Sequence, residues 1–108
     1  MRTDLLKGHV DLVLLSCLEE GPAHGYLIVK RLRARSAGEF ELLEGTLYPA
    51  LHRLEEAGLV ASRWSAENDR RRRVYRLTRR GRAALNQRVE EWRSFSRTVD
   101  LVLRGATG

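Results

Sequence analysis

Apolar residues recur at helical spacing between residues 44 and 57, where Leu47, Leu51 and Leu54 follow one another at intervals of four and three. This spacing places the three leucines on one face, so it predicts an amphipathic helix over residues 44–57. The opposite face is small and polar in its first two turns, as in a helix whose start enters a groove. Gly58 can adopt the left-handed conformation that ends a helix.

An earlier helix is predicted to begin at an N-cap supplied by Thr3 or Asp4 and to run to about Glu19. Its apolar residues lie on nearly every side. One face can pack on its own domain, and the surplus predicts a second contact with another subunit. Cys17 is the only cysteine of the chain and is interpreted as a small buried apolar residue, with a reactive thiol as the alternative.

A further helix is predicted between these two, from residues 24–26 to residues 36–38. Its inward side chains are expected to be Ile28, Val29 and Leu32, and its exposed side chains Lys30, Arg31, Arg33 and Arg35. This helix and the helix over residues 44–57 form a predicted helix-turn-helix pair. Residues 39–42 alternate between polar and apolar, which predicts a short strand between the two helices. Pro49 predicts a tight or displaced first turn in the later helix.

Two alternating segments follow, over residues 60–65 and 71–78, and predict two strands joined by a turn at residues 66–69. Tyr75 and Leu77 fall on the side of the second strand that is expected to face the core. The two strands form a hairpin that extends the helix-turn-helix pair as a wing.

The last helix is predicted to begin after an N-cap at Thr78 and to run from residue 79 to residue 104, where Gly105 ends it. Two sets of residues recur every seven positions along this helix. The first set is Leu85, Trp92 and Val99, and the second is Val89, Ser96 and Leu103. Two further apolar residues, Phe95 and Val102, lie beside them. Such a seam is longer than so small a domain can cover, which predicts pairing with a second copy. The residues expected to dimerise are Leu85, Val89, Trp92, Val99 and Leu103.

The predicted fold is therefore mainly α with a small β-hairpin. Residues 1–78 are expected to form a winged helix-turn-helix domain, and residues 79–108 a dimerisation helix. The formal net charge is +6, and residues 62–82 alone hold nine arginines against two acidic residues, so the rest of the chain is close to neutral. A basic segment beside a helix-turn-helix pair favours a polyanionic partner.

Several functions are not supported by the sequence. His9, His24 and His52 lie on separate elements without cysteines or carboxylates at metal-ligand spacing, so no metal and no cofactor are predicted. No nucleophile has an evident activating pair and no glycine-rich phosphate loop is present, so an enzyme is not expected. The start of the chain lacks the features of a signal peptide and no apolar run reaches ~18 residues, which favours a cytoplasmic location.

A group of motifs is shared with a known family. They are Gly-Thr-Leu-Tyr-Pro at residues 45–49, Arg-Leu-Glu at 53–55, Gly-Pro-Ala-His-Gly-Tyr at 21–26, Tyr-Arg-Leu-Thr at 75–78, and Trp64 and Gly81. In this order and spacing, over about residues 8–82, the chain resembles the PadR family of bacterial transcriptional regulators. The resemblance implies a homodimer that binds duplex DNA through a winged helix-turn-helix domain, most simply a repressor that occludes a promoter.

The resemblance also implies roles for individual residues. The helix over residues 44–57 is expected to enter the major groove. The DNA-binding residues fall into four groups: Thr46, Pro49, His52 and Arg53 for base edges; Tyr48 and Tyr26 for the DNA backbone; His24 and Gly25 beside Tyr26 for the same backbone; and Arg70, Arg71, Arg72 and Arg73 for flanking phosphates or the minor groove. The alternative function is a winged-helix module that binds an acidic protein partner without recognising a DNA sequence.

Trp92 and Phe95 are the candidate residues for a signal. Pairing about a two-fold axis could bring both copies of each ring together, and a flat aromatic effector could stack between them. Family members commonly respond to small molecules, so the resemblance supports such a site. The alternative is that Trp92 is simply the largest apolar side chain in a packed seam.

Overall fold

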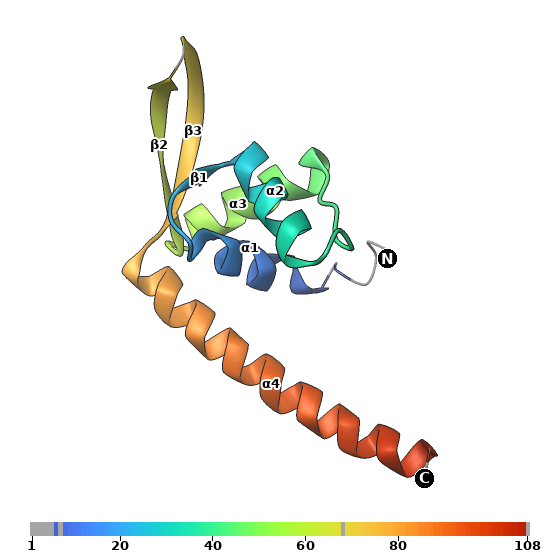
Figure 1. Ribbon diagram of the computed structural model, residues 1–108. Coiled ribbons are helices and arrows are strands. Elements are labelled where there is room, and N and C mark those ends of the chain that lie inside the picture. Colours follow the sequence, from blue (N-terminus) through green and yellow to red (C-terminus); the bar gives the residue numbers. More distant parts are fainter. Residues whose placement is uncertain (1–5, 7, 68, 108) are drawn as a thin grey trace.

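The computed structural model describes residues 6, 8–67 and 69–107, with only the backbone of residues 106 and 107. Within this part of the chain, four helices and three strands follow one another: α1 (Val10–Leu18), β1 (Ala23–His24), α2 (Gly25–Arg35), α3 (Glu44–Glu56), β2 (Val60–Glu67), β3 (Arg70–Leu77) and α4 (Arg79–Thr107). Helices α1 to α3 pack together, the β2–β3 hairpin projects from them, and α4 runs away from the hairpin (Figure 1). This arrangement confirms the winged-helix architecture and the long last helix.

The sheet is antiparallel and has the strand order β1-β3-β2. Strands β2 and β3 form the predicted hairpin, in which Val60 lies opposite Leu77 and Glu67 opposite Arg70. The third strand, β1, was not predicted, because only two residues pair with β3 and so short a segment shows no alternation. It matters for the site because it brings the start of α2 against the hairpin.

The strand predicted at residues 39–42 is wrong, since this segment is a loop in the structure. Ala37 and Gly38 have positive φ angles of 54° and 82°, which turn the chain away from α2. The backbone N–H of Phe40 then donates to the hydroxyl of Ser36 at 2.9 Å rather than to a strand. Phe40 and Leu42 still pack against the core, so the alternation reflects a loop crossing the helices.

Helix α1 begins at Val10, later than predicted. Thr3 and Asp4 lie outside the described residues, and residues 8 and 9 form a 3₁₀ turn instead of continuing the helix. His9, directly before the helix, has φ −128° and ψ 10°, which are outside the helical range, so the helix does not extend back through it. Cys17 is buried as interpreted, and burial raises the pKa of its thiol, which disfavours a reactive thiolate.

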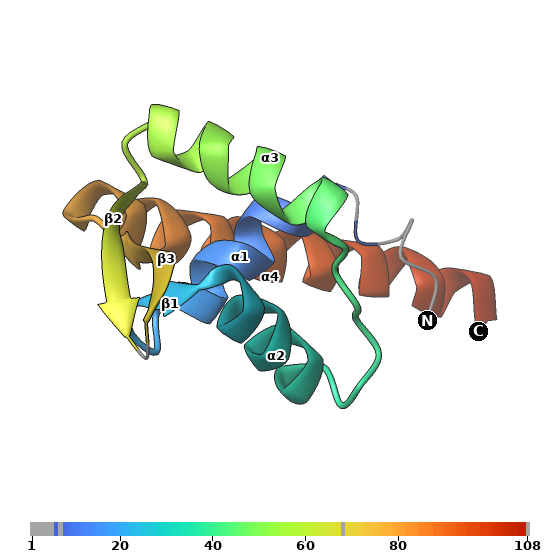
Figure 2. The same cartoon turned by 90° about the horizontal axis from the view of Figure 1, so that it is seen from above.

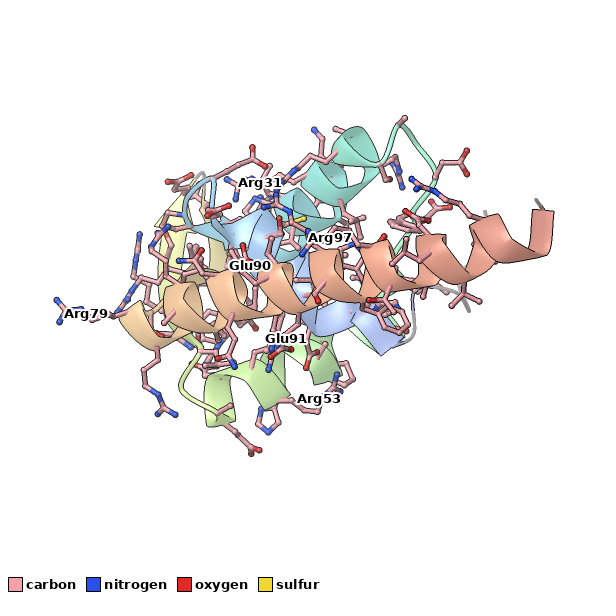
Figure 3. All side chains as sticks on the ribbon, turned by 90° about the horizontal axis from the view of Figure 1, so that it is seen from below. Arg31, Arg53, Arg79, Glu90, Glu91 and Arg97 are labelled. Carbon is pink, nitrogen blue, oxygen red and sulfur yellow. The ribbon has the colours of Figure 1, made fainter. Side chains whose placement is uncertain are left out.

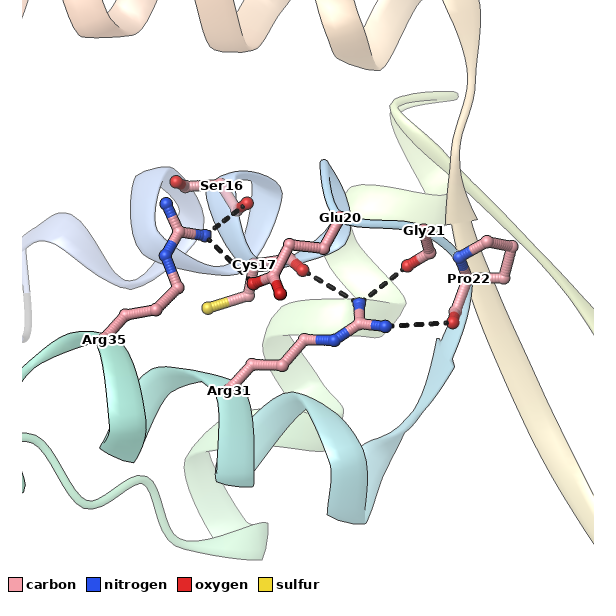
Figure 4. A network of polar contacts seen from close by, with 7 residues as sticks. All are labelled: Ser16, Cys17, Glu20, Gly21, Pro22, Arg31 and Arg35. Atoms are coloured by element: carbon pink, nitrogen blue, oxygen red, sulfur yellow. Dashed lines mark hydrogen bonds and ion pairs between the residues drawn. The ribbon is translucent and has the colours of Figure 1, made fainter.

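Arg31 of α2 holds the end of α1 (Figure 4). Its Nη1 donates to the carbonyls of Cys17 at 3.0 Å and Gly21 at 2.7 Å, and its Nη2 lies 3.4 Å from the carbonyl of Pro22. The prediction that this side chain is simply exposed is wrong, since it is half-buried. The last carbonyls of a helix have no partner within it, and the arginine supplies the missing donors.

Arg35 adds a second contact of the same kind between α2 and α1. Its Nη1 donates to the carbonyl of Ser16 at 2.8 Å and lies 3.5 Å from a carboxylate oxygen of Glu20. Figure 4 shows Arg31 and Arg35 one turn apart on α2, both directed at the end of α1. These contacts fix the angle between α1 and α2.

Helix α3 forms as predicted. Leu47, Leu51 and Leu54 are buried, and Gly58 follows the helix with a φ of 77°. The helix starts at Glu44 without displacement, and its first turn is tight, because the N–H of Thr46 bonds to the carbonyl three residues before it at 3.0 Å.

The start of α4 is fixed to the end of α3. Thr78 caps α4 as predicted, since its hydroxyl accepts the N–H of Gly81 at 3.0 Å and donates to the carbonyl of Gly58 at 2.6 Å. The N–H of Thr78 donates to the carbonyl of Leu59 at 3.1 Å. Gly81 packs so closely on that carbonyl that any Cβ there would collide with it. Glycine at this position therefore permits the close approach of α4.

Helix α4 extends to Thr107, so the prediction that Gly105 ends it is wrong. A Cβ added at Gly105 would meet none of the described atoms within 4 Å, and the cost of one glycine does not break the helix. Leu85 is 2% exposed and belongs to the core of its own chain, with Val89 packed against it. The part of the seam that is open to a second chain therefore begins at Trp92. In the view from above, α4 passes beneath the other helices and extends beyond them (Figure 2).

The described helices are also informative about membranes: none of them combines the length and the apolar character that crossing a bilayer requires.

Replacing Arg31 with alanine should lower the free energy of unfolding by about 2–3 kcal/mol, because the carbonyls at the end of α1 lose a charged donor. Urea denaturation followed by circular dichroism measures this loss. Arg33→Ala is the matched control, because Arg33 pairs with Glu41 on the surface at 2.8 Å and such pairs contribute about 0.2–1 kcal/mol. Equal losses in the two variants would show that Arg31 does not hold α1.

Candidate nucleic-acid interface

A groove of about 570 Å³ separates the hairpin from the starts of α2 and α3. Its lining combines aromatic and basic residues, and no acidic residue is among them: His24, Gly25, Tyr26, Tyr48, Trp64, Arg70, Arg71, Arg72 and Arg73. Eight of these nine were predicted as DNA-binding residues from the sequence, and Trp64 was not. Such a lining attracts anions, and its rings offer flat apolar surfaces beside the charges.

The wall formed by α2 and α3 depends on a glycine. Tyr48 lies so close to Gly25 that a Cβ on Gly25 would collide with the Tyr48 hydroxyl. The Tyr48 ring can therefore lie across the start of α2, with 44% of its surface exposed. Tyr26 is 67% exposed, and its ring is stacked 6.3 Å from that of His24. Both phenol rings therefore line the groove and remain accessible to a ligand.

His24 joins α2 to the hairpin through its two ring nitrogens. Nδ1 caps α2 by accepting the N–H of Leu27 at 3.2 Å, and Nε2 lies 2.7 Å from Nη1 of Arg72. A neutral imidazole has one acceptor nitrogen, so the ring cannot accept from both donors at once. Burial, and then the Arg72 guanidinium, lower the pKa of His24. Arginine can only donate, so the contact with Arg72 forms when Nε2 accepts and the cap of α2 forms when Nδ1 accepts.

The four consecutive arginines differ in their surroundings. Alternation along β3 puts Arg71 and Arg73 on the side of Tyr75 and Trp64, and Arg70 and Arg72 on the other side. The guanidinium carbons of Arg71 and Arg73 lie 4.8 Å and 5.3 Å from the centroid of the Trp64 ring. The sequence had suggested one shared role for all four.

Arg73 is tied to the end of α3 through Glu55 and Ser62. Its Nε donates to the Ser62 hydroxyl at 2.8 Å, and its Nη2 lies 3.8 Å from Oε1 of Glu55. The other oxygen of Glu55 accepts the N–H and the hydroxyl of Ser62 at 3.1 Å and 2.6 Å. This network fixes the hairpin relative to α3, so Arg73 has a structural task besides its charge.

The outward face of α3 carries the other predicted residues. Thr46, Pro49, His52 and Arg53 are all exposed, outside the groove. His52 pairs with Glu56 one turn on, with Nε2 and Oε1 3.0 Å apart. Arg53 lies on the flank of α3 away from Tyr48, where its Nη2 is 3.1 Å from Oδ1 of Asp11. The structure therefore separates Arg53 from the wing arginines.

A second groove, of about 540 Å³, lies between the start of α1, α3 and α4. Its lining includes Arg53, Glu91, Trp92 and Phe95, and Figure 3 shows Arg53 and Glu91 on the same side of the molecule. The Trp92 ring meets the His9 ring edge-on at 5.0 Å, and its centroid is 6.3 Å from that of Phe95. The two candidate effector residues are thus adjacent within one chain. Among the described residues, no three His, Cys, Asp or Glu side chains gather closely enough to hold a metal ion.

Sequence reasoning missed Trp64, Ser62 and Glu55 as parts of the interface. The alternation of residues 60–65 does place Ser62 and Trp64 on one side. The missing information was the register, in which Trp64 lies opposite Arg73. The loop predicted at residues 66–69 is too long: it would set Trp64 opposite Arg71, whereas in the structure Glu67 pairs with Arg70 and Trp64 with Arg73.

Comparisons with known proteins agree with this geometry. Residues 14–87 match the transcriptional regulator PadR-like family. Transcriptional regulator Rv3488 of Mycobacterium tuberculosis is 38% identical over 90 residues, which cover 83% of this chain and 81% of that protein. A transcriptional regulator from Clostridium thermocellum superimposes with a TM-score of 0.82 at 36% identity, covering 90% of this chain and 95% of the other. A PadR family transcription regulator from Clostridium difficile gives 0.78 at 36% identity, covering 89% and 99%.

Proposed function

This chain belongs to the PadR-like family of transcriptional regulators, and from that membership we propose that it binds a specific DNA duplex as a homodimer and represses transcription. The observation that carries the proposal is the basic and aromatic groove beside the exposed face of α3. In this arrangement α3 enters the major groove while one strand of the DNA backbone lies between α3 and the hairpin. The bound dimer would occlude a promoter.

The groove supplies contacts to the backbone. Tyr26 and Tyr48 offer hydroxyl donors to phosphate oxygens, and Arg72 offers a guanidinium group beside His24 at the start of α2. Arg70 and Arg71 extend the charge toward the tip of the hairpin. Contacts of this kind fix the register of a protein on DNA and supply much of its affinity without reading the sequence.

Base recognition is assigned to the outward face of α3. Thr46, Pro49 and His52 are exposed there and allow close approach to base edges. Among the four residues assigned to base edges, Arg53 is the one that can form the bidentate pair with guanine, and to do so it must leave Asp11. With so few direct readers, the shape and deformability of the DNA are expected to add to specificity.

The homodimer is assigned to the open part of the α4 seam. Trp92 is 44% exposed, Phe95 62% and Val102 68%, all on a helix that extends beyond its own domain. Contiguous exposed apolar surface of this kind is typical of an interface. A two-fold dimer requires an inverted-repeat operator with half-sites about 10 base pairs apart, or a multiple of that spacing.

The groove at Trp92 is assigned to a small aromatic effector. Three rings, those of His9, Trp92 and Phe95, lie beside two carboxylates and two guanidinium groups, a combination that suits a flat compound with polar substituents. Pairing through α4 would bring the second Trp92 ring to the same region. Asp11 pairs with Arg53 in this structure, and Arg53 must leave Asp11 to contact a base. A ligand beside Asp11 can therefore bind the DNA-free and DNA-bound states with different affinities, as regulation requires.

Selection from random duplexes should enrich an inverted repeat.

Replacing Arg71 and Arg72 together with alanine should weaken binding to every duplex and reduce the slope of log affinity against log salt by about two, because two phosphate contacts are lost. Arg79→Ala with Arg82→Ala removes equal charge at the other end of β3, where Arg79 points away from the body, and should leave the slope nearly unchanged. Arg53→Ala should instead cost about 1–3 kcal/mol at one base position. Recovery of no enriched sequence would favour a protein-interaction module.

Val102→Asp should convert the dimer to a monomer, because a buried unpaired carboxylate strongly destabilises an interface. Leu101→Asp is the matched control: it is 64% exposed, against 68% for Val102, and it lies about 180° around α4 from Trp92, nine residues on. Light scattering after size-exclusion chromatography gives the masses. A dimer in both variants would place the interface elsewhere.

The effector site can be tested by Trp92 fluorescence in a Trp64→Phe variant, in which Trp92 is the remaining tryptophan. A panel of planar organic cations and phenols should include a compound that quenches Trp92 saturably and lowers operator affinity. Phe95→Ala should weaken that compound by about tenfold or less, because one ring contact is lost. If no compound changes either signal, Trp92 is a structural residue of the seam.

A further inference from the structure

We propose that Trp64 is an additional DNA-binding residue: its ring positions Arg71 in the groove and packs against the DNA strand that Arg71 holds. This inference rests on the proposed binding of DNA. It adds a direct role for an aromatic residue on the hairpin, where the charge of the arginines alone had been considered.

The position of Trp64 does not suit a purely structural residue. It lies in the middle of β2 with 55% of its surface exposed, whereas Tyr75, on the same side of the hairpin, is buried in the core. An indole ring that keeps more than half of its surface in water stabilises a two-stranded hairpin only weakly. Because it lines the groove with Tyr26 and Tyr48, the exposed ring is available to a ligand there.

The ring also determines where two guanidinium groups lie. Arg71 and Arg73 are two residues apart on one side of β3, so their like charges repel each other. Both carbons nevertheless lie within 5.3 Å of the Trp64 centroid, which places each cation in the attractive field of the ring. Removing the ring would leave the repulsion and would free the Arg71 side chain to adopt other rotamers.

The two arginines then have different tasks. Arg73 is held by Ser62 at 2.8 Å and by Glu55 at 3.8 Å, so its charge is partly balanced and its position is tied to α3. Arg71 lies nearer the tip of the hairpin, opposite Ala66, and its contact is with the ring. Arg71 is therefore the cation that Trp64 presents to a phosphate.

A positioned arginine binds more tightly than a mobile one, because fewer rotamers are lost when the contact forms. The sugar of the bound strand offers apolar atoms to the exposed part of the ring, beside the phosphate held by Arg71. Stacking and apolar contacts of aromatic residues with nucleic acid are largely independent of sequence. Trp64 should accordingly raise affinity for all duplexes and leave base preference unchanged.

A double-mutant cycle tests the coupling, with Trp64→Leu as the variant that keeps apolar bulk but lacks a ring. In duplex binding at fixed salt, Trp64→Leu should weaken affinity by about five- to tenfold. In an Arg71→Ala background the same change should have less than about a twofold effect, because the guanidinium that the ring positions is absent. Trp64→Phe retains a ring and should restore most of the loss.

Arg70→Ala is the matched control background. Arg70 carries the same charge one residue away, but strand alternation turns it to the other side of the hairpin. In the Arg70→Ala background, Trp64→Leu should weaken DNA affinity as much as it does in the wild type. An equal effect of Trp64→Leu in the Arg71→Ala and Arg70→Ala backgrounds, or no effect in the wild type, would overturn the proposal.

Fluorescence gives a readout that a merely structural role would not change. In a Trp92→Phe variant the emission comes from Trp64, and addition of a duplex should quench it in proportion to binding. Unchanged emission at saturating DNA would also overturn the proposal. A wild-type protein that binds no duplex would contradict the proposed function itself, whereas binding without Trp64–Arg71 coupling contradicts only this inference. Thermal unfolding confirms that each variant is folded.

Discussion

The backbone of Leu59 links the end of α3 to the start of α4. The positions of these two helices relative to each other depend on this contact. The N–H of Leu59 bonds to the carbonyl of Leu54 at 2.9 Å, and the carbonyl of Leu59 accepts the N–H of Thr78 at 3.1 Å. Gly81 packs directly on that carbonyl. The end of α3 and the start of α4 thus meet through backbone groups, which leave little freedom for one helix to rotate against the other. The direction of α4 is therefore set together with the direction of α3.

Two polar networks fix the other elements around this contact at Leu59. Arg31 supplies donors to the end of α1 and so fixes α2, whose first residue borders the groove. Glu55 and Ser62 hold Arg73 and so fix the hairpin against α3. In each case a charged side chain satisfies groups that the backbone leaves without partners, at the meeting point of two elements. These contacts therefore fix the positions of the elements that border the groove.

Local patterns in the sequence predicted most elements, while contacts between distant residues were not predictable. The stripe of Leu47, Leu51 and Leu54 and the cap at Thr78 are local features, and both appear as predicted. Arg31 was assigned to the surface because helical periodicity cannot show that carbonyls 10 and 14 residues earlier need a donor. Arg53 was assigned to base edges without knowledge of Asp11, which lies 42 residues away. Leu85 matched a heptad, yet the core of its own domain had already covered it.

Helix α4 combines an anchored start with a long projecting end. Its early residues pack in the core, whereas its last turns extend the molecule to about 60 Å in its longest dimension. Under the proposed pairing through α4, substitutions in those last turns would change which chains fit together without touching the groove. Duplicated copies of such a gene could therefore diverge there first, and each protein would then avoid forming mixed pairs with its sibling. Several regulators with nearly identical DNA-reading bodies could then act independently in one cell.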